Sequence, residues 1–402
     1  MTPRPTHFLT ALAISIAVVG LVDAFTNELD TKRYSWDSKF YLDMAETGLV
    51  GNTNLVSPFA YRFLTPLLVR FLSRSTELPV ETCFRLIAYA GAVGQLFCTF
   101  LLATTFGLTF RAGVVVILVT GFSLFNVKFP LFDVYRPEHL AYPLTILAFI
   151  AAIRGRTLWV AGLTGLGLQI REFLFIPGLI HLGRLAASWF RGRSLRVLLR
   201  GMLLGMILLA AVLVPRLVIP VVASDQFVDP LIKPRSLSRL ISAPLNLKRD
   251  FNIVFATLAY SLPLLVTCTK ARLEAASEKL RSVRAALVGY AVCVLLLAMY
   301  GGTDLSRFVA YLFVPQILLI GCMVDAGVSI TEIAYMLIVV FIFNRIALEV
   351  PVWNLLAYLD FCIAYGDRVT VNTMYRIGEL GVYVAGATAL RKVVNRRAPS
   401  AL

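Results

Sequence analysis

The sequence predicts an all-α polytopic membrane protein with about twelve membrane segments, within a range of ten to thirteen. The 402-residue chain has a mean hydropathy of +0.79, and only 15% of its residues are charged. Apolar runs of roughly 15 to 20 residues recur from one end to the other. Basic residues gather between alternate runs. We therefore expect a single transmembrane domain over residues 1–402.

Each apolar run is interpreted as one membrane segment. In order, they are 8–25, 84–106, 112–126, 139–153, 157–170, 173–187, 201–222, 251–269, 285–300, 309–326, 333–348 and 377–390. The end of the first run, Val22-Asp23-Ala24, resembles a signal-peptide cleavage site. A single Arg precedes that run, so we expect an uncleaved anchor.

Lys and Arg are distributed unevenly over the connections between these segments. With a cytoplasmic N-terminus, the inner connections hold 18 of the 38 Lys and Arg but only four of the 23 Asp and Glu. The main inner stretches are Arg184–Arg200, KARLEAASEKLRSVR and the basic tail at 391–402. This positive-inside pattern predicts that both termini are cytoplasmic and that 26–83 is the first extracytoplasmic loop.

The net charge of +15 does not indicate a nucleic-acid-binding protein, because the basic excess follows the inner connections and suits anionic lipids. The three histidines form no metal-binding motif, and the six cysteines stand singly. A zinc hydrolase is therefore not expected.

The first outer loop contains an unusual stretch, YSWDSKFYLDMAETG, at residues 34–48. If SWDSKFYLDMAE is helical, a rotation of about 100° per residue separates an apolar arc from a polar arc. The apolar arc holds Trp36, Asp37, Phe40, Tyr41 and Met44, and the polar arc holds Lys39, Asp43 and Glu46.

Two acids of this helix are therefore expected to differ. Asp37 borders the apolar arc, where partial desolvation suits a general base. Asp43 lies on the polar arc, within i, i+4 reach of Lys39. A simpler interpretation of Asp37, as a helix cap after Trp36, stays open.

The same loop continues with YRFLTPLLVRFLSR, in which Thr65-Pro66 suits a helix N-cap and first position. The helix is too short to span a membrane and amphipathic, so we expect it to lie in the membrane interface. Its basic residues Arg70 and Arg74 are expected to snorkel towards water. Arg62, beside Tyr61 at the edge of a Pro58-Phe59-Ala60-Tyr61 turn, is a candidate for contact with a lipid phosphate.

Polar side chains also gather in later outer segments. The loop NVKFPLFDVYRPEHLAYP holds Asp133, Arg136, Glu138 and His139. The pairs Arg171–Glu172 and Asp304–Arg307 lie in QIREF and YGGTDLSRF. Each pair could be a structural ion pair or part of a binding site, and the sequence is compatible with both interpretations.

An outward acid after the first segment, an amphipathic first loop and basic inner loops together resemble the polyprenyl-phosphate-dependent membrane glycosyltransferases of the GT-C fold. The similarity is strongest over residues 30–70, where WDSKFYLDMAETG and SPFAYRFLTPLL look like the bacterial members. The segments TDLSRF and REFLFIPG also look like later segments of such proteins. The chain has no D-x-D motif, no large soluble C-terminal domain and no sequon-binding signature, so protein N-glycosylation is not expected.

The resemblance implies that Asp37, the acid of the first outer loop, is the catalytic base. It implies sugar transfer from a polyprenyl-phosphate donor to a glycan or lipid acceptor at the outer face of the bacterial cytoplasmic membrane, with inversion at C1. The residues expected to bind substrate are Tyr41, Tyr61, Arg62, Arg136, Glu138, Arg171, Glu172, Asp304 and Arg307. No cofactor is required by this interpretation, and a divalent cation stays open.

The alternative is a transporter or flippase for a lipid-linked or polar solute. Pro-interrupted segments such as LVPRLVIP and SLPLLV favour it, because broken helices form sites in the middle of membranes. One observation disfavours the transporter alternative. Ion-coupled transporters usually have acidic residues deep within their membrane segments, and few acids lie there in this sequence. An inactive scaffold of the same fold is the third reading.

Overall fold

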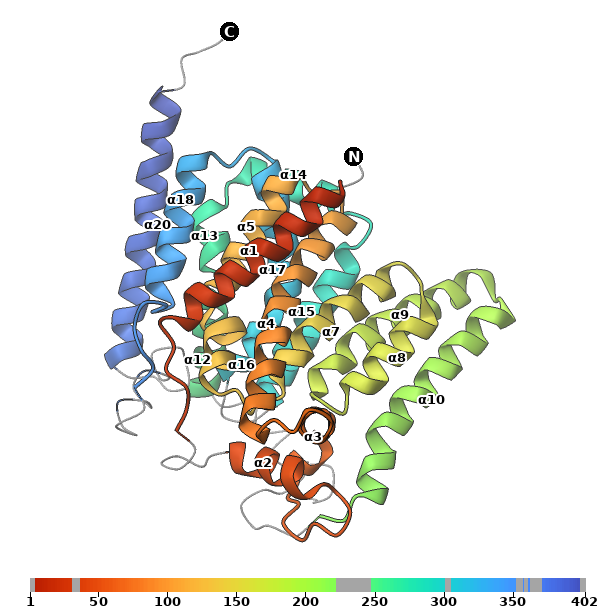
Figure 1. Ribbon diagram of the computed structural model, residues 1–402. Coiled ribbons are helices and arrows are strands. Elements are labelled where there is room, and N and C mark those ends of the chain that lie inside the picture. The colour runs from red at the N-terminus through yellow and green to blue at the C-terminus, as the bar shows by residue number, and fades with distance from the viewer. Residues whose placement is uncertain are drawn as a thin grey trace. The chain divides into compact units, whose positions relative to one another are not determined.

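The computed structural model describes residues 4–30, 37–221, 247–300, 305–351, 357, 361 and 371–397 (Figure 1). Every element in these residues is helical, and they contain no strand. The predicted all-α class is therefore confirmed. The chain divides into two compact units. Unit 1 comprises residues 1–27, 99–128 and 242–402, and unit 2 comprises residues 28–98 and 129–241.

Among the described residues, five helical stretches are long and apolar enough to cross a membrane: Pro5–Asp23, Val80–Thr105, Glu172–Gly192, Leu195–Val218 and Leu305–Asp325. Two bent helix pairs raise this number to seven if each pair is one span. Three further apolar helices are shorter, at 10–17 residues. These helices are compatible with a multi-pass membrane protein. Each of the twelve predicted segments overlaps helical residues, although 112–126 and 251–269 are each divided between two helices, and a count of about twelve spans stays a prediction.

Unit 1 is a helical bundle in which α17 packs against α5 and α14, and α1 also packs against α5. Its elements are α1 (Pro5–Asp23), the end of α4 (Val80–Thr105), α5 (Phe110–Gly121), η2 (Leu124–Lys128), α12 (Leu247–Tyr260), α13 (Leu262–Thr267), α14 (Lys270–Lys279), α15 (Arg284–Tyr300), α16 (Leu305–Val309), η5 (Ala310–Leu312), α17 (Phe313–Asp325), α18 (Ile330–Phe343) and α20 (Val371–Arg397).

Contacts at one end of unit 1 join segments that the sequence assigns to the inner side. The Arg111 guanidinium donates to the Val328 carbonyl at 2.7 Å, and Lys279 pairs with Asp325 at 2.8 Å. Glu332 pairs with Arg272 at 2.7 Å and with Arg391 at 3.1 Å. The His7 ring lies 4.6 Å from the Phe110 ring, so the start of α1 and the end of α20 reach this same end of the unit.

Other contacts join segments that the sequence assigns to the outer side. The buried ammonium of Lys128 donates to the carbonyls of Phe25 at 2.8 Å and of Ile346 and Leu348 at 2.6 Å each. Arg345 pairs with Glu379 at 2.8 Å. Each of these contacts links two segments of the same predicted side, as the alternation of loops requires.

Unit 2 joins a helical loop region to a four-helix group. Its elements are α2 (Ser38–Thr47), η1 (Phe59–Tyr61), α3 (Leu64–Thr76), the first part of α4, α6 (Phe129–Phe132), α7 (Glu138–Ile153), α8 (Thr157–Gly167), η3 (Glu172–Leu174), α9 (Phe175–Gly192) and α10 (Leu195–Val218). Helices α7, α8, α9 and α10 pack on one another, and α2 packs on α3 (Figure 1). Only three residues of α10 are buried, and ten of its large apolar side chains are exposed, which suits a lipid-facing helix.

The first outer loop is helical, as predicted, although both helix starts differ from the prediction. Helix α2 begins at Ser38 rather than Ser35, and α3 begins at Leu64, so Thr65 and Pro66 lie inside its first turn. Thr65, Pro66 and Val69 are buried, whereas Leu68 and Phe71 are exposed, with Phe71 at 71%. An exposed apolar ridge on a short helix is typical of the membrane interface.

Arg70 does not snorkel as predicted. Its guanidinium turns towards α2, donating to the Ala45 carbonyl at 3.1 Å and to the Glu46 carbonyl. The last carbonyls of a helix are free to accept hydrogen bonds and carry partial negative charge, which explains this pairing. Gly48 ends α2 at φ 90°, and a side chain there would meet Arg70 at 3.3 Å. Arg70 therefore fastens α3 to the end of α2.

Candidate functional site

The candidate site lies in unit 2 and is built around an ion pair between Arg62 and Glu172, 110 positions apart. The Arg62 Nε and Nη2 groups donate to one Glu172 oxygen at 3.0 and 2.8 Å. The Glu172 side chain is 44% exposed and that of Arg62 is 14% exposed. Burial alone would lower the pKa of Arg62, but the charge of Glu172 raises it above its ordinary value. Arg62 is therefore a fixed cation at the edge of the site.

A second, more buried ion pair lies beside the first. Arg171 pairs with Glu138 at 3.0 Å, and both side chains are almost fully buried. The Arg171 Nε atom is also 4.0 Å from the Glu172 Oε2 atom. Arg171 and Glu172, which the sequence suggests as partners of each other, mainly pair with Glu138 and Arg62 instead. These two pairs bring together the first outer loop, the loop before α7 and the short turn before α9.

Asp133 and Arg136 form the third pair, in the Pro-bounded loop before α7. Asp133 is fully buried, and its Oδ1 atom has no hydrogen-bond partner among the described residues. The Arg136 guanidinium also lies 5.2 Å from the Phe129 ring centroid. Burial raises the pKa of Asp133, the charge of Arg136 opposes that rise, and the charge of Asp37 adds to it. Asp37 and Asp133 therefore lie close enough to interact electrostatically.

Asp37 occupies the N-cap position of α2, but its side chain makes no capping hydrogen bond. Its backbone is in the αR region, with φ −62° and ψ −23°, whereas a capping residue is usually extended. The helix-cap interpretation of Asp37 is therefore wrong for its side chain. Asp37 is half-buried and next to the fully buried Ser38.

Asp43 has a different environment, as its predicted position on the other arc implies. Its carboxylate accepts a hydrogen bond from the Asn52 amide at 2.7 Å, and the same amide also donates to Thr47 and to the Gly48 carbonyl. Lys39 lies over the Phe40 ring at 4.9 Å instead of pairing with Asp43. Asp43 therefore holds the turn after α2 in place.

Aromatic residues line the same part of unit 2. Tyr41 is buried, its hydroxyl accepts a hydrogen bond from Arg62 at 3.4 Å, and burial raises its pKa. The rings of Phe40 and Phe59 stack at 4.6 Å. Tyr61 lies 4.7 Å beneath the Arg216 guanidinium. Tyr41 and Tyr61 are thus held by arginines rather than presented freely to a sugar.

His139 has a structural role in this loop. It is buried, and its Nε2 atom lies 2.9 Å from the Val134 carbonyl. A Cβ at Gly91 of α4 would come within 2.7 Å of His139, so glycine allows the two helices to approach here.

Two residues of the predicted site do not belong to the described residues of unit 2. Arg307 is a buried residue of α16 in unit 1. Asp304 lies outside the described residues, as does the expected stacking residue Trp36. The sequence interpretation also missed Arg216, because it lies within an apolar run that reads as a membrane segment. The nearby Tyr61-Arg62 dipeptide gives no local sign of that long-range contact.

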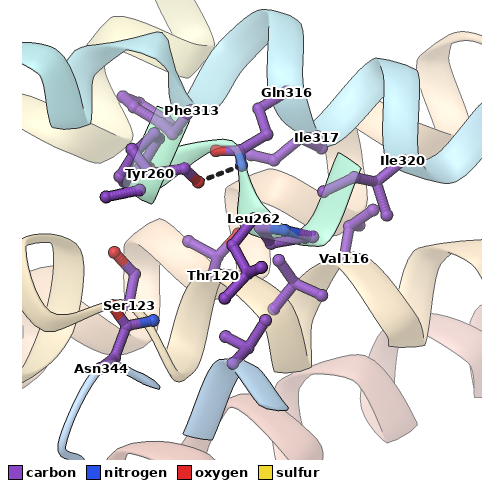
Figure 2. A pocket seen from close by; sticks show the side chains of 14 residues that line it. Val116, Thr120, Ser123, Tyr260, Leu262, Phe313, Gln316, Ile317, Ile320 and Asn344 are labelled. Atoms are coloured by element: carbon purple, nitrogen blue, oxygen red, sulfur yellow. Dashed lines mark hydrogen bonds between the residues drawn. The ribbon is translucent and has the colours of Figure 1, made fainter. Parts of the chain in front are cut away.

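A separate polar pocket lies in unit 1, between α5, α12, α13, α17 and α18 (Figure 2). Helix α5 ends at Gly121 and the chain bends by 70° into η2, and α12 ends at Tyr260 just before α13. The Asn344 amide donates to the Phe122 carbonyl at 2.7 Å, and the Gln316 amide donates to the Tyr260 carbonyl at 2.6 Å. Two side-chain amides thus satisfy carbonyls that the helix breaks leave without helical partners.

The described residues contain no group of three or more His, Cys, Asp or Glu side chains that could hold a metal ion. No protein-family model and no curated protein matches this sequence.

Proposed function

We propose that this chain is a membrane glycosyltransferase that moves a sugar from a polyprenyl-phosphate donor to a glycan or lipid acceptor. The observation that carries the proposal is the cluster of ion pairs made by Arg62, Arg136 and Arg171, in the same unit as the half-buried Asp37. A carboxylate not engaged in helix capping, among fixed arginines and aromatic rings, is suited to activating a hydroxyl near a phosphate.

In this proposal, Asp37 accepts the proton of the acceptor hydroxyl as that oxygen attacks C1 of the sugar. The new C1–O bond forms as the bond from C1 to the phosphate oxygen breaks, and polyprenyl phosphate leaves with the electron pair. A single displacement inverts the configuration at C1. Burial raises the pKa of Asp133, and Arg136 opposes that rise by pairing with its carboxylate, so Asp133 serves the site as the partner of Arg136.

The leaving phosphate requires positive charge, and each of Arg62, Arg136 and Arg171 already pairs with a carboxylate. Of the three carboxylates, Glu172 is the most exposed, so it can most easily give up its place to a phosphate oxygen. Arg62 is then the best candidate to stabilise the charge that develops on the leaving group. Arg171 and Arg136 hold Glu138 and Asp133 in position.

The proposed location is the bacterial cytoplasmic membrane, with the site on the extracytoplasmic face. The positive-inside distribution of Lys and Arg and the contacts within each predicted side support this orientation. The exposed ridge of α3 would then lie in the outer leaflet interface, next to the loop that carries Asp37.

The transporter alternative draws on the broken helices of unit 1. The pocket at those breaks has a volume of about 20 Å³, which accommodates about one water molecule. Its Gln316 amide donates to the Tyr260 carbonyl (Figure 2), and its Asn344 amide donates to the Phe122 carbonyl. A cavity of that size does not admit a sugar or a lipid headgroup, so we favour the enzyme.

The proposal is tested with purified protein in detergent, where no separated compartments exist. We expect lipid-linked sugar to be consumed and polyprenyl phosphate to be released together with a new glycosidic bond. If a broad set of donors and acceptors gives no such bond, and the protein moves those lipids across proteoliposome membranes, the flippase alternative replaces the enzyme.

A further inference from the structure

The connection between α9 and α10 concentrates exposed positive charge. We define the α9–α10 tip as residues 189–200, which contain Arg191, Arg193, Arg196 and Arg200, all exposed. Residues 173–224 contain no Asp or Glu, so no acid nearby in the sequence neutralises these arginines. The tip belongs to unit 2 and lies at the opposite end of α9 from the Arg62–Glu172 pair.

One half-buried and one exposed aromatic side chain, Trp189 and Phe190, accompany this charge. Helix α9 ends at Gly192, and Arg193 takes a left-handed conformation at φ 45°, which turns the chain sharply into α10. The Arg193 guanidinium lies 6.0 Å from the Trp189 ring, which contacts Phe190 edge to face at 4.9 Å. Phe190 is 69% exposed. Aromatic rings beside arginines at a helix end are typical of the boundary between lipid tails and headgroups.

An apolar stripe runs along α10 directly from the tip. Its exposed residues are Leu195, Leu199, Met202, Leu203 and Met206, which the helical repeat places on one face. By the same repeat, Arg196 and Arg200 lie along one edge of this face. The surface therefore offers an apolar strip with guanidinium groups at one end and one side, which matches the shape of a phospholipid.

We propose that the α9–α10 tip is a binding site for an anionic phospholipid of the adjacent leaflet. The headgroup phosphate lies among Arg191, Arg193, Arg196 and Arg200, and the acyl chains lie along the apolar stripe of α10. Guanidinium groups suit this role because two N–H groups can bind two phosphate oxygens at once. The site is independent of the proposed sugar transfer.

The basic residues of α14 provide a useful contrast. There Arg272 pairs with Glu332, Lys279 with Asp325 and Arg281 with Glu278. Cations already paired with acids attract a lipid phosphate less strongly. A nucleic acid could bind the arginines of the tip but would leave the apolar stripe exposed to water, whereas a lipid covers both.

The test uses the full chain in detergent, titrated with phosphatidylglycerol, with phosphatidylcholine or with inorganic phosphate, while the thermal unfolding midpoint is measured. The variant replaces Arg191, Arg193, Arg196 and Arg200 with Gln. The matched control replaces the exposed cations Lys270, Arg281, Arg284 and Lys392 with Gln and removes the same charge. Each basic residue near an anionic lipid surface strengthens binding about fivefold.

We expect phosphatidylglycerol to raise the midpoint of the wild type and the control, and the variant to need at least about ten times more of this lipid for the same rise. Phosphatidylcholine and inorganic phosphate should give little rise. Equal responses of variant and control, or equal responses to both lipids, would overturn the proposal. So would a full response to phosphate alone, which would indicate a simple anion site. Should the fourfold variant fail to insert, the Arg196→Gln and Arg200→Gln double variant decides the matter, with a loss of at least about fivefold expected.

Discussion

Arg62 combines three contacts in one side chain. Its guanidinium holds Glu172 through two N–H groups and reaches the Tyr41 hydroxyl through a third, while the Phe59 ring lies 5.9 Å below it. A lysine could carry the charge but not this arrangement, because an ammonium group lacks the planar fork. The residue is therefore a sensitive probe of whether the cluster serves catalysis or only stability.

We predict that Arg62→Ala lowers kcat by about 10² to 10³ and that Arg62→Lys lowers it less, because lysine keeps the charge near the leaving phosphate. Steady-state kinetics with a lipid-linked donor measures both. Arg85→Ala is the matched control, because it removes an exposed Arg–Glu pair of the same unit and should change kcat less than about twofold. Equal kcat in wild type and Arg62→Ala would remove Arg62 from the mechanism.

Asp133 provides a prediction about pH. Its pKa is raised in the folded protein, mainly by burial, so the folded state keeps a proton that the unfolded chain releases at lower pH. The stability that this proton provides is present below the ordinary pKa of an Asp and is lost as pH rises towards the raised value. We predict that wild type loses stability relative to Asp133→Asn as pH rises above about 4. Thermal unfolding midpoints of wild type and Asp133→Asn, measured across this pH range, test the prediction. Parallel curves of midpoint against pH for the two proteins would contradict it.

At the scale of elements, the two helix breaks of unit 1 show how apolar helices tolerate interruption. The carbonyls of Phe122 and Tyr260 accept hydrogen bonds from the side-chain amides of Asn344 and Gln316, which come from other helices. A buried carbonyl without a partner is costly because lipid and apolar side chains cannot replace water. The two amide side chains of this pocket are therefore explained by the backbone carbonyls to which they donate hydrogen bonds.

We predict that Gln316→Leu and Asn344→Leu each lower the free energy of unfolding by about 1 to 3 kcal/mol, because each leaves a buried carbonyl unsatisfied. Gln169→Leu is not suitable as the control, because the Gln169 amide also donates to a backbone carbonyl, that of Ala211. Thr388→Val on the exposed face of α20 is therefore the control. Chemical unfolding in detergent measures the free energy of unfolding of each variant. A decrease no larger than that of Thr388→Val would count against this explanation.

The helices could be predicted from the sequence because their signal is local. Each of the twelve predicted apolar runs overlaps helical residues. The periodicity of residues 35–46 predicts different surroundings for Asp37 and Asp43, but both side chains are half-buried in the structure. The partners of the charged residues could not be predicted in the same way. Arg62 and Glu172 are 110 positions apart, and neighbours such as Arg171 and Glu172 suggest a local pair instead. Helix starts also shifted, because Asp37 and Thr65 do not cap as their residue types suggest.

Within unit 1, the contacts of each predicted side indicate how the chain alternates across the predicted membrane segments. The inner group joins the start of α1, α14 and the end of α20, and the outer group joins the ends of α1, η2 and α18. The positive-inside pattern then assigns the first group to the cytoplasm.

We predict that, in a cysteine-free background, a cysteine at position 39 reacts with a membrane-impermeant thiol reagent in intact cells and a cysteine at position 282 does not. Lys39 and Ser282 are both exposed, so access depends on the side of the membrane. Permeabilised cells, in which both positions should react, provide the control. Labelling of position 282 but not 39 would mean that the orientation is reversed.

The central claim is that Asp37 is the base of a sugar-transfer reaction, and the release of polyprenyl phosphate by purified wild type, Asp37→Asn and Asp43→Asn tests it most directly. Both variants change one carboxylate of the same short loop region, but only Asp37 is coupled to Asp133, while Asp43 binds Asn52. We predict that Asp37→Asn loses about 10² to 10⁴ in rate and that Asp43→Asn keeps most of it. Equal rates for the two variants, with equal amounts of folded protein, would contradict the account.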